Sequence, residues 1–291
     1  MYHNTRTLLQ KQGLAPTKRL GQNFLVHRHT AERIVDLAGV QESDTVVEVG
    51  VGLGALTLPL ADTCSRVIGF EADAGIIRMH REHQDLPGHV ELRHEDVLKT
   101  DLTALADDTG GPLKLIANLP YSISSPFLFR LIKYCDCMDY AVLMLQKEVG
   151  ERLLARVNTK QYGVPTVLLA ICARLTLLMK VGAAEFHPRP KVDSVVVRLD
   201  FFSREQRHRL YGDLDTVLFK KLVNAAFGQR RKTLKNSLGS TGLLSSADLA
   251  AAMTRAAINP SARAGVLEPE AYVRLTREVA DTMDAPGGER P

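Results

Sequence analysis

The sequence contains no tryptophan, and only 5% of its 291 residues are aromatic. A surface with many aromatic anchors is therefore not expected, so a tyrosine or phenylalanine inside a motif is more informative than usual. Cysteine is also scarce, and the four residues Cys64, Cys135, Cys137 and Cys172 have no second Cys or His pair at the spacing of a metal site. The nine histidines form no ligand pattern either, so we expect free thiols and no metal.

Long hydrophobic runs are absent as well. The longest uncharged apolar stretch near the centre of the chain, residues 164–173, is about half the length of a membrane-spanning helix. Residues 1–15 contain no apolar core of a secretory signal. With 45% hydrophobic and 24% charged residues, the composition is that of a globular protein with one large domain or two smaller ones. We therefore expect a cytoplasmic protein without a membrane partner.

The charged residues are distributed unevenly. Residues 1–33 contain six basic residues and one acidic residue, and residues 201–247 contain nine basic and three acidic ones. The segment between them is acidic, although the net charge of the whole chain is +4. Two basic segments indicate a polyanionic partner such as nucleic acid, because Lys and Arg neutralise phosphates. A solvated charged surface would give the same counts, so charge alone does not decide.

Strands and helices alternate through the first half of the chain. The hydrophobic pattern predicts strands at residues 45–49, 66–70, 89–93, 113–117 and 140–145, and helices at 30–39, 55–61, 73–82 and 125–134. This alternation is typical of an α/β fold whose mostly parallel sheet is covered by helices on both faces and binds ligands at the carboxyl ends of its strands.

The pattern changes near residue 203. Short helices are predicted at residues 215–227, 230–239, 246–256 and 269–282. We therefore expect an α/β domain at residues 1–203, a small helical domain at 204–284 and a disordered tail at 285–291.

A glycine-rich loop follows the first predicted strand. It reads Glu48-x-Gly50-x-Gly52-x-Gly54, and glycine lets a backbone turn tightly and approach a ligand closely. The spacing differs from the dinucleotide fingerprint G-x-G-x-x-G, and no Lys-Ser/Thr pair follows as it does in a P-loop. For this loop alone, a plain tight turn is the alternative interpretation.

Acidic residues end the next two strands. A carboxylate at Glu71 can accept both hydrogen bonds of a ribose diol, and Asp96 could accept one from an adenine amine. Together the two residues predict a nucleoside-bearing cofactor along the carboxyl edge of the sheet. Incidental acidic residues at strand ends are the alternative.

The tetrapeptide Asn118-Leu119-Pro120-Tyr121 follows the fourth strand and is the most specific motif. The amine of adenine or cytosine is a poor nucleophile because its lone pair is delocalised into the ring. The Asn118 side-chain oxygen and a backbone carbonyl beside Pro120 can accept both N–H bonds and free that lone pair for attack. Tyr121 offers a stacking face for a base taken out of its helix.

The glycine loop and this tetrapeptide together resemble the class I S-adenosylmethionine-dependent methyltransferases that modify amino groups of nucleic acids. Longer strings narrow the resemblance to the ribosomal RNA adenine dimethyltransferases, in particular those of the bacterial small subunit. These strings are residues 18–25 (KRLGQNFL), 145–149 (LQKEV), 186–194 (FHPRPKVDS) and 227–234 (FGQRRKTL). The similarity covers residues 18–275, nearly the whole chain.

The resemblance implies a Rossmann-like methyltransferase domain, S-adenosylmethionine as methyl donor and no metal. It implies dimethylation of N6 on two adjacent adenosines in the 3′-terminal hairpin of small-subunit ribosomal RNA, by a monomer that takes part in subunit biogenesis. Its partner would be the small ribosomal subunit.

The site residues implied by the resemblance fall into three groups. Cofactor contacts are implied for Asn23, Leu25, Gly50, Gly52, Glu71, Asp96 and Asn118; target-base contacts for Asn118, Leu119, Pro120, Tyr121 and Phe186; and RNA phosphate contacts for Arg230, Arg231, Lys232 and Lys235. Core packing is the alternative for Phe186, and a solvated helix face is the alternative for the basic residues. The chain departs from the family at Val51, where Pro is usual, so we expect a slightly different loop that still binds the cofactor.

Three rival functions stay open at this point. A macrolide-resistance methyltransferase of the large subunit shares the loop and the tetrapeptide, but the string at residues 229–234 favours the small-subunit enzyme. A binding protein that monitors subunit assembly, or a transcription factor, would not need the complete set of cofactor and target residues. A nicotinamide-dependent dehydrogenase is disfavoured by the glycine spacing.

Overall fold

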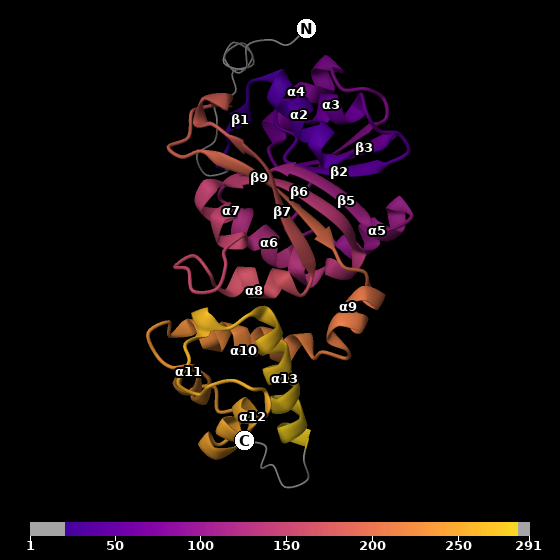
Figure 1. Cartoon of the computed structure of the whole chain (residues 1–291). Helices are drawn as coiled ribbons and strands as arrows, with labels where there is room; N and C mark the ends of the chain where they lie inside the picture. Colours follow the sequence, from indigo (N-terminus) through magenta and orange to yellow (C-terminus); the bar gives the residue numbers. More distant parts are fainter. Residues whose placement is uncertain (1–20, 285–291) are drawn as a thin grey trace. The chain divides into compact units, whose positions relative to one another are not determined.

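The computed structural model describes residues 21–284, which divide into two compact units (Figure 1). One unit contains residues 21–150 and Arg174–Phe201, and the other contains residues 151–173 and 202–284. The sequence interpretation had assigned residues 151–173 to the first domain. They join the second unit because Tyr162 packs against Phe227, and the Tyr162 hydroxyl donates a hydrogen bond to the Leu267 carbonyl at 2.8 Å. The predicted tail at 285–291 and the start of the string at 18–25 lie outside the described residues.

The first unit is built on a seven-stranded sheet with the order β4-β3-β2-β5-β6-β9-β7. Its strands are β2 (Thr45–Val49), β3 (Arg66–Glu71), β4 (Val90–His94), β5 (Leu113–Asn118), β6 (Met138–Gln146), β7 (Ala173–Val181) and β9 (Ser194–Phe201). Strands β2 to β6 pair in parallel, and β9 is antiparallel to β6. The predicted mostly parallel α/β sheet is therefore confirmed, with β7 and β9 added beyond the strands that the sequence pattern identified.

Helices and a short ribbon surround this sheet. The helices are α2 (Arg28–Ala38), α3 (Thr57–Ala61), α4 (Ala74–His83), α5 (Leu102–Thr109), α6 (Ser124–Lys133) and α7 (Lys147–Leu153), and the ribbon pairs β1 (Phe24–Leu25) with β8 (Phe186–His187). Ile34 of α2 and Leu60 of α3 share one buried cluster with Val46, Ile116 and Val142 of the central strands. Burial of such side chains stabilises the unit by about 25 cal/mol for each Å² of apolar surface removed from water.

The register of the central strands places their carboxyl ends side by side. Val49, the last residue of β2, lies opposite Phe70 of β3 and Ala117 of β5. The residues that follow, namely the glycine loop, Glu71 and Asn118, therefore leave the sheet at one edge. In an open parallel sheet this edge is where ligands bind.

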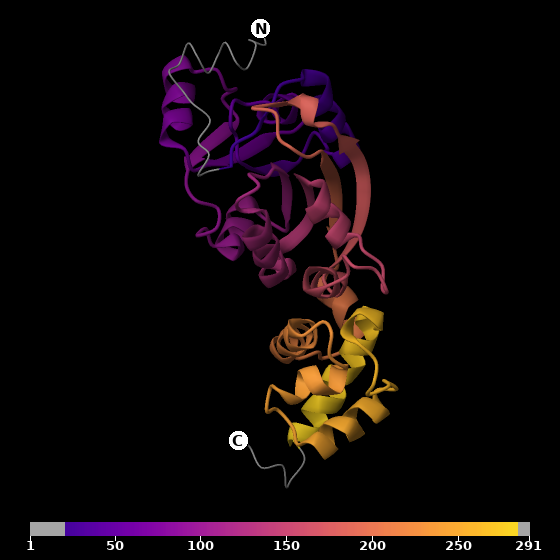
Figure 2. The same ribbon diagram turned by 90° about the vertical axis from the view of Figure 1, so that its left-hand side faces the viewer.

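The second unit consists of helices. They are α8 (Val164–Ala170), α9 (Arg204–Tyr211), α10 (Thr216–Gly228), α11 (Leu234–Gly239), α12 (Ser246–Arg255) and α13 (Pro269–Asp284). Figure 2 shows α10 beside α13, where Phe227 packs against Tyr272 with ring centroids 6.0 Å apart. The helix expected at 230–239 starts only at Leu234, because the Thr233 side chain accepts the Asn236 N–H and caps it. Residues 230–232 therefore form a turn and not a helix face.

Among residues 21–284, no helix combines the length and the hydrophobicity needed to cross a membrane.

Gly150 of α7 packs against Val195 of β9 in the first unit, and this contact predicts that only glycine fits at residue 150. A Cβ added there would lie 2.2 Å from Val195 Cγ2. We expect Gly150→Ala to lower the free energy of unfolding by about 1–3 kcal/mol in urea denaturation, as overpacking does in cores. Gly228→Ala is the matched control, because a Cβ at this residue of α10 meets no atom within 4 Å and alanine favours helix. Equal stability of the two variants would contradict the packing argument.

Candidate functional site

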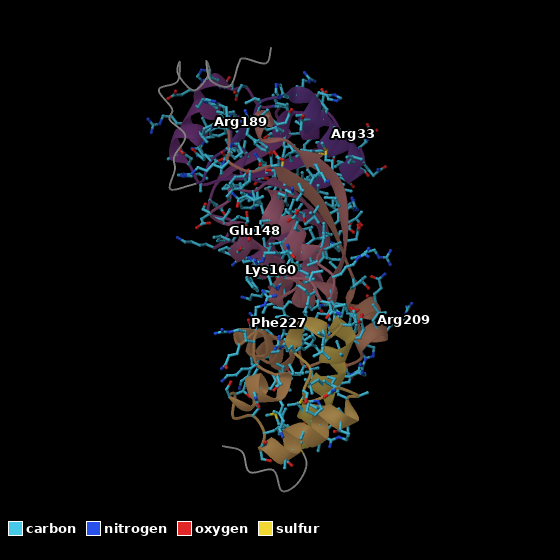
Figure 3. The ribbon with its side chains drawn as sticks, turned by 60° about the vertical axis from the view of Figure 1, so that its left-hand side comes forward. Arg33, Glu148, Lys160, Arg189, Arg209 and Phe227 are labelled. Carbon is cyan, nitrogen blue, oxygen red and sulfur yellow. The ribbon has the colours of Figure 1, made fainter. Side chains whose placement is uncertain are left out.

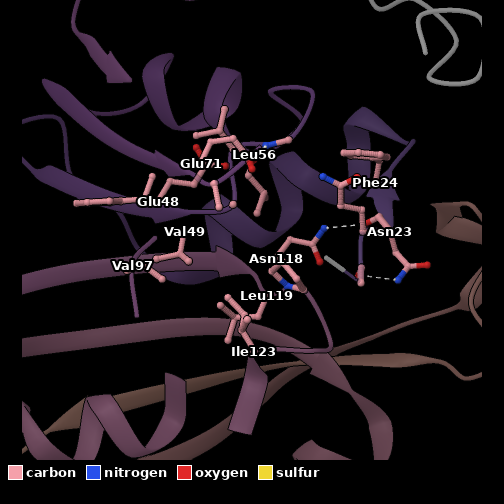
Figure 4. A pocket seen from close by; sticks show the side chains of 18 of the residues that line it. Asn23, Phe24, Glu48, Val49, Leu56, Glu71, Val97, Asn118, Leu119 and Ile123 are labelled. Atoms are coloured by element: carbon pink, nitrogen blue, oxygen red, sulfur yellow. Dashed lines mark hydrogen bonds between the residues drawn. The ribbon is translucent and has the colours of Figure 1, made fainter. Parts of the chain in front are cut away.

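A cavity of about 280 Å³ opens at the carboxyl edge of the sheet (Figure 4). It is lined by residues 21–25, 48–53, 70–72, 95–98 and 118–123, together with Ala55 and Leu56. The N-terminal segment, the glycine loop, both acidic strand ends and the tetrapeptide therefore meet in one place. The seven residues expected to contact a cofactor all line this cavity.

The glycine loop is held by hydrogen bonds from its own backbone. The Gly50 N–H donates to the Phe70 carbonyl at 2.8 Å, and the Gly52 N–H donates to Glu71 Oε2 at 2.9 Å. Gly52 has φ of 55°, and a Cβ there would lie 3.2 Å from the Phe24 ring, so a side chain would be both strained and crowded. Only glycine fits this position without a shift of the loop.

Glu71 connects the loop to the next strand. Its Oε1 accepts the Asp73 N–H at 2.8 Å while Oε2 accepts the Gly52 N–H. Burial raises the pKa of Glu71, and these two backbone hydrogen bonds oppose the increase. Each carboxylate oxygen has a second lone pair, so Glu71 can still accept hydrogen bonds from a ligand in the cavity.

Val51 stands where the family usually has proline, and the structure shows what its side chain contacts. Its side chain is buried, and a Cβ at Gly69 would lie only 2.5 Å from Val51 Cγ2. Val51 therefore packs over β3 at a position where the strand has no side chain. The expectation that this loop still binds a cofactor stays a prediction.

Asn118 is oriented by the N-terminal segment. Its Nδ2 group donates a hydrogen bond to the Asn23 carbonyl at 3.1 Å, as the dashed line in Figure 4 marks. Within residues 21–284, no donor reaches the Asn118 Oδ1 atom, so this oxygen can accept a hydrogen bond from a ligand. The Pro120 carbonyl is already used, because it accepts the Ile123 N–H at 3.0 Å, whereas the Leu119 carbonyl accepts no hydrogen bond from a described residue.

Tyr121 is the aromatic residue of the tetrapeptide that lines the cavity. Its ring is half-buried, and its hydroxyl forms a 3.0 Å hydrogen bond with Ser194 Oγ of β9. Burial raises the pKa of the Tyr121 hydroxyl above its ordinary value of 10.0. The hydroxyl is therefore protonated near neutral pH and anchors the ring instead of serving as a base.

Phe186 is placed differently from the expected stacking residue. It is 4% exposed, pairs with Leu25 through β1 and β8, and belongs to the buried cluster that contains Leu25 and Val196. Phe186 does not line the cavity, because the ribbon turns its ring into the core. Its contact with a target base stays a prediction that this geometry does not support.

The basic residues expected to contact RNA lie in the second unit. Arg230 donates to the carbonyls of Lys160 and Tyr162, at 2.7 and 3.0 Å, and so ties the turn at 230–232 to residues 160–162. Figure 3 labels Lys160, one of the two acceptors, and Phe227, which lies in α10 shortly before this turn. Arg231 and Lys232 are exposed and form no ion pair with a described residue, and Lys235 is partly exposed on α11. Arg230 therefore has a structural role that the sequence did not indicate.

Glu48 is a residue of the cavity to which the sequence interpretation gave no role. It is 1% exposed, and neither carboxyl oxygen has a hydrogen-bond partner in the described structure. Burial raises the pKa of Glu48 to about 8. A glutamate in an otherwise apolar strand was the available signal, since a buried carboxyl needs a partner.

The described lining of the site, within residues 21–284, offers hydrogen-bond acceptors and no lysine or arginine. Carboxyl groups from Glu48, Glu71 and Asp96 line one cavity, together with the apolar side chains of Val97 and Leu98. This composition fits a ligand that combines hydroxyl groups, an apolar ring with an amine, and a positive charge. Among residues 21–284, no group of His, Cys, Asp and Glu side chains could hold a metal ion.

Comparison with known proteins agrees with this geometry. A family model described as ribosomal RNA adenine dimethylase matches residues 15–281. The chain is 47% identical to the ribosomal RNA small subunit methyltransferase A of Desulfotalea psychrophila, over 97% of this chain and 98% of that protein. It is 41% identical to the protein of the same name from Geobacter metallireducens, over 97% of this chain and 100% of the relative.

Solved structures show the same fold. A dimethyladenosine transferase from Plasmodium falciparum superimposes with a TM-score of 0.70 at 25% identity, covering 89% of this chain and 98% of that one. The 23S rRNA methyltransferase ErmE superimposes with a TM-score of 0.63 at 24% identity, covering 89% and 100% of the two chains.

The buried carboxyl of Glu48 predicts a dependence of stability on pH. In the unfolded chain a glutamate ionises near 4.5, whereas the folded protein keeps this proton until about pH 8. Between these values the folded state binds more protons than the unfolded state, so this group makes stability fall as pH rises. We expect Glu48→Gln to remove that fall, so its melting temperature exceeds the parent's by a margin that grows from pH 5 to pH 8.

Differential scanning fluorimetry of the cofactor-free protein measures this margin. Glu42→Gln, which changes an exposed carboxylate, is the matched control and should follow the parent. A margin for Glu48→Gln that is the same at every pH would show that the carboxyl is not buried in its neutral form.

Proposed function

Because the chain belongs to the ribosomal RNA adenine dimethylase family, we propose that it dimethylates N6 of two adjacent adenosines in the 3′-terminal hairpin of small-subunit ribosomal RNA. It is an rRNA adenine dimethyltransferase by family membership. The relatives named for the small subunit support the choice of substrate. We further propose that it acts as a monomer in the cytoplasm, on the small ribosomal subunit, and contributes to subunit biogenesis.

One observation carries the proposal for the catalytic site. The Asn118 side chain is fixed through its nitrogen to the Asn23 carbonyl, which leaves its oxygen as an acceptor at the edge where Glu71 and the glycine loop also lie. An amide oxygen in this position can accept a hydrogen bond from an exocyclic amine. The arrangement suits transfer of a group to nitrogen.

The residues of the cavity fit S-adenosylmethionine. Glu71 would accept hydrogen bonds from the ribose hydroxyls, and Asp96 would accept one from the adenine amine, beside the apolar Val97 and Leu98. Among residues 21–284, no group forms a hydrogen bond with the Glu48 carboxyl, and a positively charged ligand would provide a partner. When bound, S-adenosylmethionine supplies an electrophilic methyl group on a cationic sulfur.

The protein's contribution to the reaction is positioning and hydrogen-bond acceptance. Asn118 Oδ1 and the Leu119 carbonyl would accept the two N–H bonds of the target amine, which localises its lone pair on nitrogen. Pro120 fixes φ between these acceptors and Tyr121. The Tyr121 ring would stack on the target base, with its hydroxyl held by Ser194. Orientation of this kind supplies most of the rate when the electrophile is already reactive.

RNA phosphates are proposed to contact the basic residues of the second unit. Arg231 and Lys232 are exposed on the turn before α11, and Lys235 follows on that helix. Arg230 contributes chiefly by holding this turn against the carbonyls of residues 160 and 162. Contacts of this type position the RNA without reading its sequence.

Methyl transfer to ribosomal subunits tests the proposed substrate. Small subunits from cells that lack the modification are incubated with labelled S-adenosylmethionine, and the RNA is analysed by mass spectrometry. We expect N6,N6-dimethyladenosine at both adjacent sites of the terminal hairpin. Transfer to large-subunit RNA instead would indicate the resistance type of activity, and tight binding without transfer would indicate a binding factor.

Truncation of Asn118 tests the proposed role of the tetrapeptide. We expect Asn118→Ala to reduce turnover by about 10²–10³-fold, because a preorganised hydrogen-bond acceptor is lost. The melting temperature should stay within a few degrees of the parent, since Asn118 is only partly buried. Asn224→Ala, whose side chain bonds only within α10, is the matched control and should keep full turnover. Near-normal product formation by Asn118→Ala would refute the mechanism.

A further inference from the structure

A buried histidine lies directly beneath the glycine loop. His80, in the last turn of α4, is 3% exposed. Its Nε2 atom is 2.8 Å from the Gly52 carbonyl oxygen, and its Nδ1 atom is 2.7 Å from Asp85 Oδ1. A Cβ at Gly54 would lie 3.7 Å from His80 Cε1, so the ring also supports the far end of the loop.

Both partners of this imidazole are hydrogen-bond acceptors. A neutral histidine carries one N–H, so one of its nitrogens would face an acceptor oxygen with a lone pair. The imidazolium has two N–H groups and can donate to the Gly52 carbonyl and to Asp85 together. The geometry on both sides of the ring is therefore satisfied by the protonated form.

The surroundings of His80 favour this charge. Burial lowers the pKa of His80, but hydrogen bonds to Asp85 and to the Gly52 carbonyl outweigh it, so the net pKa is raised above 6.5. The charged groups that act on the ring are Asp85, between α4 and β4, and Glu71, at the end of β3. The position in the last turn of α4 adds to the effect, because helix carbonyls stabilise a cation there.

The same peptide segment that His80 holds also orients a proposed cofactor ligand. Gly52 donates its N–H to Glu71 Oε2 and presents its carbonyl to His80. Hydrogen bonds thus fix the residue from both sides. Because a glycine is needed at this positive φ, the residue has no side chain that could hold the loop in place. Loss of the His80 contact would free the Gly52 carbonyl. The Gly52 N–H would then no longer be held in alignment with Glu71.

We infer that protonated His80, supported by Asp85, is a positioning residue that holds the glycine loop in its cofactor-binding form. This inference rests on the proposed use of S-adenosylmethionine. Affinity for the cofactor is then highest while His80 keeps its proton, and it falls as pH rises through the pKa of that residue. Glu48 acts in the opposite direction, because its ionisation near pH 8 creates an anion that attracts a cationic ligand.

A comparison between two proteins separates the two effects. His80→Gln keeps a side-chain N–H donor for the Gly52 carbonyl but does not titrate, and Glu48 is the same in both proteins. Isothermal titration calorimetry with S-adenosylmethionine, from pH 6 to pH 9, gives the ratio of the parent Kd to the variant Kd. We expect this ratio to increase about tenfold over that range, as the coupling of a proton to a binding site typically allows.

His83→Gln is the matched control. His83 lies in the same turn of α4, but its Nδ1 bonds to the Met79 carbonyl within the helix. Its ratio to the parent should stay constant with pH. A constant ratio for His80→Gln as well would overturn the inference while leaving the proposed function intact. Failure of the parent protein to bind the cofactor at every pH would overturn both.

Nitrogen-15 NMR of the cofactor-free protein gives a second measurement, independent of binding. The ring signals of His80 are assigned by their absence in His80→Gln. We expect both ring nitrogens to carry a proton at pH 6.5, and Asp85→Asn to move the titration to lower pH because the carboxylate charge is removed. A single protonated nitrogen at pH 6.5 in the parent protein would overturn the inference.

Discussion

The hydrogen bond from the Gly52 N–H to the Glu71 carboxylate is the interaction on which the site depends. It joins the loop after β2 to the end of β3, two segments that the parallel register has already placed side by side. Phe24 packs where a side chain at residue 52 would be, so the N-terminal segment can approach only because the loop takes this path. Asn23 in turn fixes Asn118. Displacement of Gly52 would therefore disturb the parts of the cavity around both Glu71 and Asn118, which are the proposed cofactor and target sides.

The electrostatics of the cavity follow from the same arrangement. Carboxyl groups of Glu48, Glu71 and Asp96 line one space, and no lysine or arginine among residues 21–284 lines it with them. Burial raises the pKa of Glu48 to about 8, so near neutral pH the free protein keeps a proton on this carboxyl and reduces the repulsion. A cationic ligand reverses this preference because it favours the ionised carboxylates. The polyanionic substrate is repelled by the same charges, which explains why basic residues are concentrated in the second unit.

The sequence predicted the parallel strands and the residues at their carboxyl ends, because strand periodicity and glycine spacing are local signals. It did not predict the assignment of residues 151–173, since the Tyr162–Phe227 contact joins segments that are far apart in the chain. It also predicted a helix from residue 230, although α11 begins only at Leu234, after the Thr233 cap. Glu48 and His80 were missed as site residues for a related reason. A buried carboxyl without a partner, or an imidazole between two acceptors, is defined by what packs around it, and one sequence does not contain that information.

The acidity of the cavity also explains why an amide, and not a carboxylate, would face the target amine in the proposed reaction. A carboxyl in place of the Asn118 amide, beside Glu48, Glu71, Glu95 and Asp96, would have its pKa raised by its neighbours and by burial. In its protonated form it would donate a hydrogen bond where an acceptor is required. The Asn118 amide does not titrate, so its oxygen accepts at every pH at which the protein is folded. Its nitrogen meanwhile needs an acceptor of its own, and the Asn23 carbonyl provides it. The asymmetry of the amide group therefore allows one side chain to be anchored to the segment that contains Asn23 and, in the proposed reaction, to present a fixed acceptor to the substrate.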